Sequence, residues 1–158
     1  MPGEQEKIHR EDYSHLLLLV VGSHLRAEEA DRPLAYQLRD HIKTWLSEHS
    51  DVLNESIEPV VCSDIWYLNN DRLQRRPTVC IGGPGVNALS AFFAQHLPQD
   101  TSFDRQVVIQ IDPDFTDLRV CLWGSDNELT KKGLDVFIKQ YLDGYLRAVA
   151  TQVEPKED

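Results

Sequence analysis

Continuous apolar runs alternate along this chain with segments in which apolar residues recur every three or four positions. Residues 15–22 hold four leucines and two valines in succession and end at a glycine, which is typical of a strand buried on both faces of a parallel sheet. Two shorter runs, residues 57–62 and 78–81, predict further strands. This alternation indicates an α/β fold.

Helical periodicity appears in three segments. The first begins near Pro33 and continues to about residue 48, the second covers residues 86–97 before Pro98, and the third extends from about residue 127 to residue 150. A short helical turn is expected over residues 65–70, with Asp64 at its N-cap. We expect these helices to pack against the sheet.

Two more apolar runs, residues 106–111 and 118–123, are separated only by residues 112–117. A parallel pair needs a crossover of about a dozen residues or more, so these two strands form a hairpin if they pair. We therefore predict a three-layer α/β sandwich with a mostly parallel sheet of about five strands, the last strand antiparallel, flanked by helices.

Length and composition indicate one soluble domain. The chain has 158 residues, and we assign residues 13–150 to a single α/β domain between polar tails at residues 1–12 and 151–158. With 26 acidic and 16 basic side chains, the net charge of -10 disfavours nucleic acid and anionic membranes as partners. The longest apolar run is too short to span a bilayer and the first residues do not resemble a secretory signal, so we expect a cytoplasmic protein.

The three cysteines, Cys62, Cys80 and Cys121, each follow a valine within a strand-like run and show no CxxC spacing. They are interpreted as small buried hydrophobes in a reducing compartment. The six histidines are scattered, so the sequence predicts no metal site, and no cofactor can be named.

Ligands of open α/β sheets bind outside the carboxyl ends of the strands. In this chain that rule selects residues 22–24, Ser63 and Asp64, residues 82–85, Asp112 and residues 124–126. If the last two strands form a hairpin, Asp112 and Gly124 lie at opposite ends of the sheet. We assign Asp112 to the site, because its strand is expected to continue the parallel series.

The glycine-rich turn over residues 82–87 is the strongest candidate for a binding site. Gly82, Gly83 and Gly85 would let a phosphate or carboxylate approach the backbone at a helix N-terminus, and Asn87 could add a side-chain donor. The turn matches neither nucleotide fingerprint, since it is not GxGxxG and no lysine follows it. Alternatively, the glycines only permit a tight reversal of the chain.

The long connection over residues 22–32 is a candidate lid or contact loop. Ser23 or Arg26 could hold an anionic group, and His24 could act as acid or base. The simpler interpretation is a solvated loop in which Asp31 caps the next helix. A triad of Ser23, His24 and Asp64 has weak support, because neighbouring side chains on an extended chain diverge and no GxSxG elbow is present.

The Gly82-Gly83-Pro84 turn with Asn87, followed by a hairpin and by residues 123–130, resembles a pattern in the C-terminal α/β modules of archaeal S-layer proteins. In those modules a GGPxxN turn precedes a helix, and a later glycine-containing segment with a threonine opens the last helix. The resemblance implies that this turn can serve the architecture of the fold.

Three functions follow as hypotheses. The first is a small domain that binds an anionic or nucleotide-like molecule through Ser23, His24, Asp64, Gly82, Gly83, Gly85 and Asn87. The second is a non-catalytic interaction or assembly module, a homodimer or the holder of a protein partner, which exposed Tyr141 and Tyr145 on the last helix would favour. The third is a hydrolase or transferase that uses His24 and an aspartate.

Overall fold

The computed structural model describes residues 13–51, 57–96, 102–104 and 106–151. These residues build a six-stranded sheet in the order β2-β1-β3-β6-β5-β4. The strands are β1 (Leu16–Val21), β2 (Glu58–Ser63), β3 (Thr78–Ile81), β4 (Ser102–Asp104), β5 (Val107–Gln110) and β6 (Arg119–Gly124). Strands β2, β1, β3 and β6 pair in parallel, whereas β5 is antiparallel to both of its neighbours.

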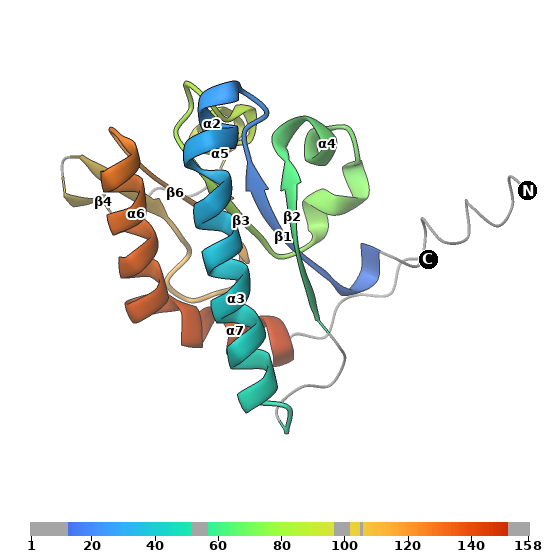
Figure 1. Cartoon of the computed structure of the whole chain (residues 1–158). Coiled ribbons are helices and arrows are strands. Elements are labelled where there is room, and N and C mark those ends of the chain that lie inside the picture. Colours follow the sequence, from blue (N-terminus) through green and yellow to red (C-terminus); the bar gives the residue numbers. More distant parts are fainter. Residues whose placement is uncertain (1–12, 52–56, 97–101, 105, 152–158) are drawn as a thin grey trace, which may run out of the picture.

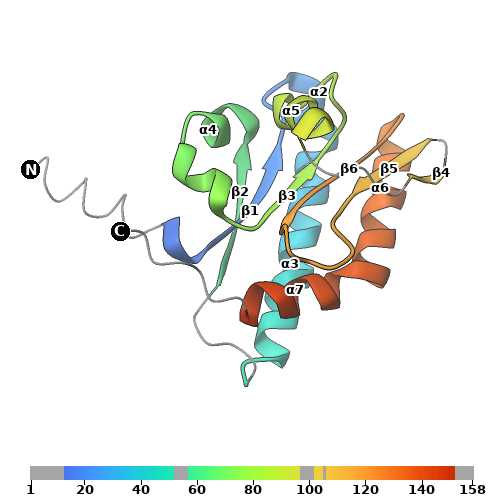
Figure 2. The same ribbon diagram turned by 180° about the vertical axis from the view of Figure 1, so that it is seen from behind.

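Helices cover both faces of the sheet (Figures 1 and 2). One face packs against α3 (Arg32–Glu48) and the C-terminal helical segments α6 (Asn127–Val136), η3 (Phe137–Tyr141) and α7 (Leu142–Thr151). The other packs against α4 (Asp64–Leu68), the 3-10 helix η2 (Asp71–Arg75) and α5 (Ala88–His96). Two further short segments are the 3-10 helix η1 (Tyr13–His15) and α2 (Leu25–Ala30).

The alternating side chains of β1 explain the two cores. Leu17, Leu19 and Val21 enter the core beneath α3, whereas Leu16, Leu18 and Val20 enter the core beneath α5, and all six are buried. A strand that is apolar on both faces needs cover on both sides, as the uninterrupted run indicated. The three-layer α/β fold with a mostly parallel sheet is confirmed.

The direction of the hairpin strands needs correction. β5 and β6 do form a hairpin, but β6 continues the parallel series beside β3 and the antiparallel strand is β5 rather than the last one. Gly124 therefore belongs to the carboxyl edge with Gly22 and Gly82, and Asp112 lies at the opposite edge. The hairpin itself could not reveal this, because either member of an antiparallel pair can join the parallel strands.

Other boundaries differ in detail. The connection over residues 22–32 contains the helix α2, β4 joins β5 at the sheet edge, and residues 137–141 form a π-helical segment inside the predicted last helix. Among the described residues, no helix has the length and apolar composition needed to cross a bilayer.

Candidate functional site

The carboxyl edge brings most of the predicted site residues together, but Asp64 binds the protein's own backbone there. Its Oδ1 atom accepts hydrogen bonds from the Ser23 N–H at 3.0 Å, from the Ser23 hydroxyl and from the Ile65 N–H at 2.7 Å. Its Oδ2 atom accepts the Ala88 N–H, the first of α5, at 2.7 Å. This buried carboxylate thus occupies the helix N-terminus at which an external anion was expected.

Asn87 completes this internal use of the turn. Its Oδ1 atom accepts the N–H groups of Leu89 and Ser90 at 2.9 and 3.3 Å, which caps α5. Its Nδ2 atom donates to the carbonyl oxygens of Ile81 at 3.0 Å and Val20 at 3.4 Å, at the ends of β3 and β1. Because connections leave these two strands on opposite faces of the sheet, the crevice between them is the expected ligand position, and Asn87 fills it.

The glycines of this edge serve two purposes. At Gly22 there is no room for a side chain, because the Val86 carbonyl oxygen lies 1.8 Å from the position that a Cβ atom would take. Gly82 has a φ of 114°, and the Asp31 Oδ2 atom lies 2.6 Å from its Cβ position. Gly85, by contrast, has nothing within 4 Å of its Cβ position. The tight approach at Gly22 and Gly82 is architectural, whereas Gly85 faces open space.

His24 is used for capping. Its Nδ1 atom accepts the Arg26 N–H at 3.2 Å and so caps α2, while Ser23 bonds directly to Asp64. The proposed Ser-His-Asp relay is therefore not assembled in this arrangement: the histidine does not stand between the serine and the aspartate.

A cavity of about 310 Å³ lies next to the glycine turn, toward α2 and α6. Its lining combines residues 83–86 of the turn, residues 123–127 after the end of β6, Thr130, and the side of α2 that carries Arg26, Ala30 and Asp31. We call it the edge pocket. Of the seven residues predicted to bind an anionic ligand, Gly83 and Gly85 line it and the other five do not: Ser23, His24, Asp64, Gly82 and Asn87. Residues 124–126, which the strand-end rule also selected, line it as well.

Asp31 is the chemically distinctive residue of the edge pocket. Its side chain is 6% exposed, and its Oδ1 atom receives one long hydrogen bond, from Asn127 Nδ2 at 3.4 Å. No described residue donates to its Oδ2 atom. Burial raises the pKa of this carboxyl group above its ordinary value, and the Asn127 hydrogen bond offsets only part of that effect.

The sequence pointed to Asp31 as a helix cap, and the backbone explains why it is not one. An N-cap residue normally has extended φ and ψ values, but Asp31 is helical (φ -93°, ψ -32°) since α2 passes almost directly into α3. Its side chain makes no capping hydrogen bond and lies over Gly82. The short polar run before Pro33 has no apolar periodicity that would predict the helix α2.

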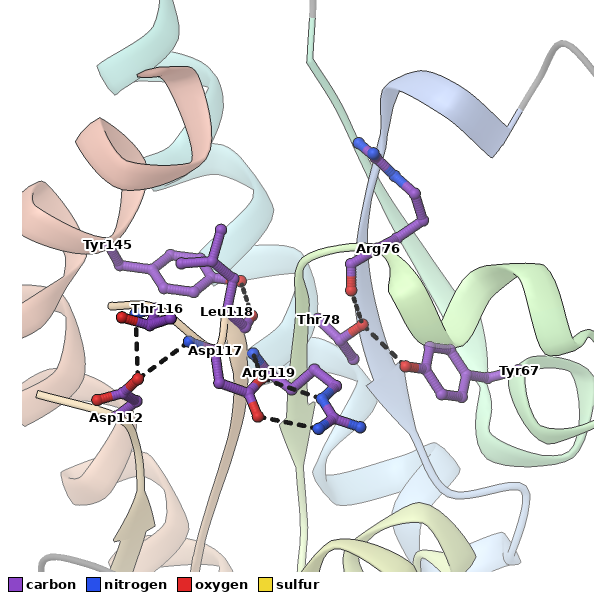
Figure 3. Close-up of polar contacts among 9 residues, drawn as sticks. All are labelled: Tyr67, Arg76, Thr78, Asp112, Thr116, Asp117, Leu118, Arg119 and Tyr145. Carbon is purple, nitrogen blue, oxygen red and sulfur yellow. Dashed lines mark hydrogen bonds and ion pairs between the residues drawn. The ribbon is translucent and has the colours of Figure 1, made fainter. Parts of the chain in front are cut away.

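The opposite edge of the sheet holds Asp112. Its carboxylate accepts the N–H groups of Asp117, Asp114 and Thr116, each at 3.0 Å, and these bonds lower its pKa. Figure 3 shows the bonds from Thr116 and Asp117. Asp112 therefore shapes the β5–β6 connection.

A second cavity, of about 360 Å³, lies beside Asp112 between residues 74–77 and 116–119. At this cavity the Arg119 guanidinium is paired with both carboxylate oxygens of Asp117 (Figure 3).

The cysteines are buried and free, as predicted. Cys80 and Cys121 are directly paired residues of β3 and β6, and the Ser90 hydroxyl lies 3.2 and 3.3 Å from their sulfur atoms and donates to the Gly82 carbonyl. Burial raises the pKa of Cys62 to about 12. Within the described ranges, no group of three or more His, Cys, Asp or Glu side chains is placed to hold a metal ion.

Comparisons with protein-family models, with curated proteins and with solved structures found no match to this chain.

Proposed function

We propose that this protein binds a small molecule in the edge pocket, beside the glycine turn rather than on the helix N-terminus behind it. The observation that carries this proposal is Asp31, a nearly buried carboxylate that lines a cavity while one of its oxygens has no donor among the described residues. Buried polar groups normally find partners, so one left open toward a cavity is a candidate ligand contact.

Electrostatics argue for a ligand that donates hydrogen bonds. The N–H groups of Ala88, Leu89 and Ser90 are already bonded to Asp64 and Asn87, so little of the α5 terminus remains for an anion. The pocket itself is lined by two carboxylates, Asp31 and Asp126, and one guanidinium, Arg26. An anionic or nucleotide-like ligand would depend on Arg26, and it enters the test as the class that the sequence predicted.

Gly85 offers a direct test of the location. Since its Cβ position is open, Gly85→Leu should fold normally and place a side chain in the edge pocket. Ala94→Leu adds the same side chain to an exposed position of α5 and serves as the control. Wild type and both variants would be screened by thermal shift, and by amide chemical shifts of residues 83–86 and 123–127, against amines, sugars, nucleotides and sugar phosphates.

The expected result is a ligand class that stabilises the wild type and Ala94→Leu but not Gly85→Leu. A ligand that stabilises all three equally would place the binding site elsewhere. Stabilisation by no member of the panel at millimolar concentration would contradict the proposal.

A second candidate function, protein interaction, has support from exposed apolar side chains at the same edge. Leu25 is 70% exposed, and Ile65 and Trp66 of α4 are 53% and 39% exposed. The feature expected from the sequence is not the one found: Tyr145 is fully buried and donates to the Leu118 carbonyl, and Tyr141 is half-buried. The triple variant Leu25→Ser, Ile65→Ser, Trp66→Ser should abolish copurification of a partner or self-association in light scattering, if this edge docks a protein.

A further inference from the structure

The Oδ2 atom of Asp31 lies where no residue of the described part of the chain gives it a hydrogen-bond donor. It lies 2.6 Å from the place where a Cβ of Gly82 would stand, so the carboxylate rests on the Gly82 backbone. The N–H group of Gly82 is already donated to the Leu122 carbonyl at 3.0 Å. The one side-chain donor, Asn127, serves Oδ1 and also donates to the Ala30 carbonyl at 2.8 Å.

Among the residues that the structure describes, none gives Asp31 a cationic partner. On α3 the neighbouring Arg32 pairs with Glu28 of α2, with Nε and Oε2 3.0 Å apart. Asp126, which precedes α6, adds a second negative charge to the lining and caps Leu129. Arg26 of α2 also lines the pocket, but its side chain is exposed and forms no hydrogen bond or ion pair with Asp31.

A partly desolvated carboxylate that faces a cavity is stabilised most by a charged donor that reaches it there. The cavity of about 310 Å³ is at the lower end of the size range of small-molecule pockets, so the donor must belong to a compact molecule. The net charge of -10 favours the approach of cations to this molecule.

We propose that the edge pocket selects a compact organic cation, a primary ammonium or amidinium compound, whose N–H groups donate to Asp31 Oδ2. This inference rests on the proposed function, because it names the ligand class of the same pocket. Asp31 is then the residue that determines specificity, and the turn at residues 83–86 supplies the wall against which the body of the ligand packs.

Benzamidinium and benzamide test the proposal, because they share a shape and differ in charge and in donor pattern. Both would be titrated into the full chain, with amide chemical shifts of residues 83–86 and 123–127 as the readout. We expect benzamidinium to bind the wild type about tenfold more tightly than benzamide, or better, as a charge-assisted hydrogen bond in an enclosed site would give.

Two variants with the same change of charge separate the role of Asp31 from general electrostatics. Asp31→Asn should weaken benzamidinium binding by about tenfold or more, whereas Glu29→Gln, at an exposed position of α2 just before Asp31, should change it by about twofold or less. If Asp31→Asn does not fold, the comparison of the two compounds on the wild type still decides.

The outcomes distinguish this inference from the proposed function. Equal binding of both compounds, or equal binding by wild type and Asp31→Asn, overturns the cationic class, and the pocket proposal survives if Gly85→Leu still abolishes that binding. Both compounds are also tested at 20 mM, on the order of a thousandfold above a tight small-ligand Kd. If neither compound then changes the amide chemical shifts of residues 83–86 and 123–127, the cationic class is overturned, whatever other ligand binds. If no member of the wider panel binds either, the proposed function fails as well.

Discussion

At the scale of single residues, a buried carboxyl group with one long hydrogen bond reduces stability when it is ionised. Burial raises the folded-state pKa of Asp31 above 3.8. Between the unfolded and the folded pKa, the folded protein therefore binds more protons than the unfolded chain. Its contribution to the free energy of unfolding is therefore most favourable at low pH and decreases as pH rises through the folded pKa. Asp31→Asn should raise the free energy of unfolding at pH 7, by about 1 to 3 kcal/mol.

Urea unfolding at several pH values measures this effect. The gain in Asp31→Asn should shrink as the pH falls toward 4, and Glu29→Gln, the same change of charge at an exposed position, is the control. A variant that is less stable than the wild type at pH 7 would mean that Asp31 has a partner and holds the fold. If Asp31→Asn is more stable but no longer binds the ligand, Asp31 is a residue that lowers the stability of the fold and serves binding.

Asp64 should behave in the opposite way. Its carboxylate accepts four hydrogen bonds from three segments, and in Asp64→Asn one carboxylate oxygen becomes an NH₂ group that faces an N–H donor in either orientation of the amide. We expect a loss of about 2 to 3 kcal/mol in the free energy of unfolding, measured by urea denaturation. Asp40→Asn, an exposed change on α3, is the control, and a loss no larger than in that control would show that Asp64 is not structural.

At the scale of elements, apolar patterning predicted β1, β2, β3, β5, β6 and the long helices within a few residues, because each of them buries a continuous face. It did not predict the short strand β4. It predicted less where tertiary contacts decide. The α2 helix has one buried apolar side chain, Ala27, and so shows no periodic signal. The direction of β6 depends on which hairpin member pairs with β3, and both are buried apolar runs.

The paired strands make a prediction about the thiols. Val20 of β1 lies between Cys62 and Cys80, and Cys80 is paired with Cys121, so the three thiols follow one row of the sheet under α4 and α5. Burial raises the pKa of Cys62 to about 12 and that of Cys80 well above its ordinary value. All three should resist a thiol-specific reagent at pH 8 in the native protein, with reaction about a thousandfold slower than in the unfolded chain.

The control is the same reaction in 6 M guanidinium, which unfolds the protein because even hyperstable proteins have unfolding midpoints that begin at about 5 M. There, three thiols should react at the rate of free cysteine. A thiol that reacts rapidly in the native state would show that its strand opens, or that it is accessible and available for chemistry. Such a result would make that cysteine a candidate nucleophile.

At the scale of the whole molecule, the sequence predicted which residues meet at one edge of the sheet but not the cavity that lies beside them. Parallel strands bring residues 22–24, 64 and 82–87 to one edge by topology alone, which is why those residues could be predicted as neighbours. Asp31, Trp123 and Asn127 come from segments whose meeting depends on the direction of β6 and on the helix α2. Which polar groups satisfy one another, as Asp64 and Asn87 do at α5, is also decided only by packing.

The net charge of the molecule leads to a final prediction, in which salt acts with opposite sign on folding and on binding. A charge of -10 on 158 residues repels itself, and raising the salt from 10 to 300 mM shortens the Debye length from about 30 Å to less than 10 Å. The melting temperature of the free protein should therefore rise, by about 2 to 4 °C for a gain near 1 kcal/mol.

The same screening weakens the attraction of a cationic ligand, so the affinity for benzamidinium should fall while that for benzamide stays constant. Calorimetry of the free protein and titration of both compounds across the salt series measure the two effects. Parallel changes in stability and cation affinity would show that local ion pairs, rather than the overall negative charge, dominate the electrostatics of this protein.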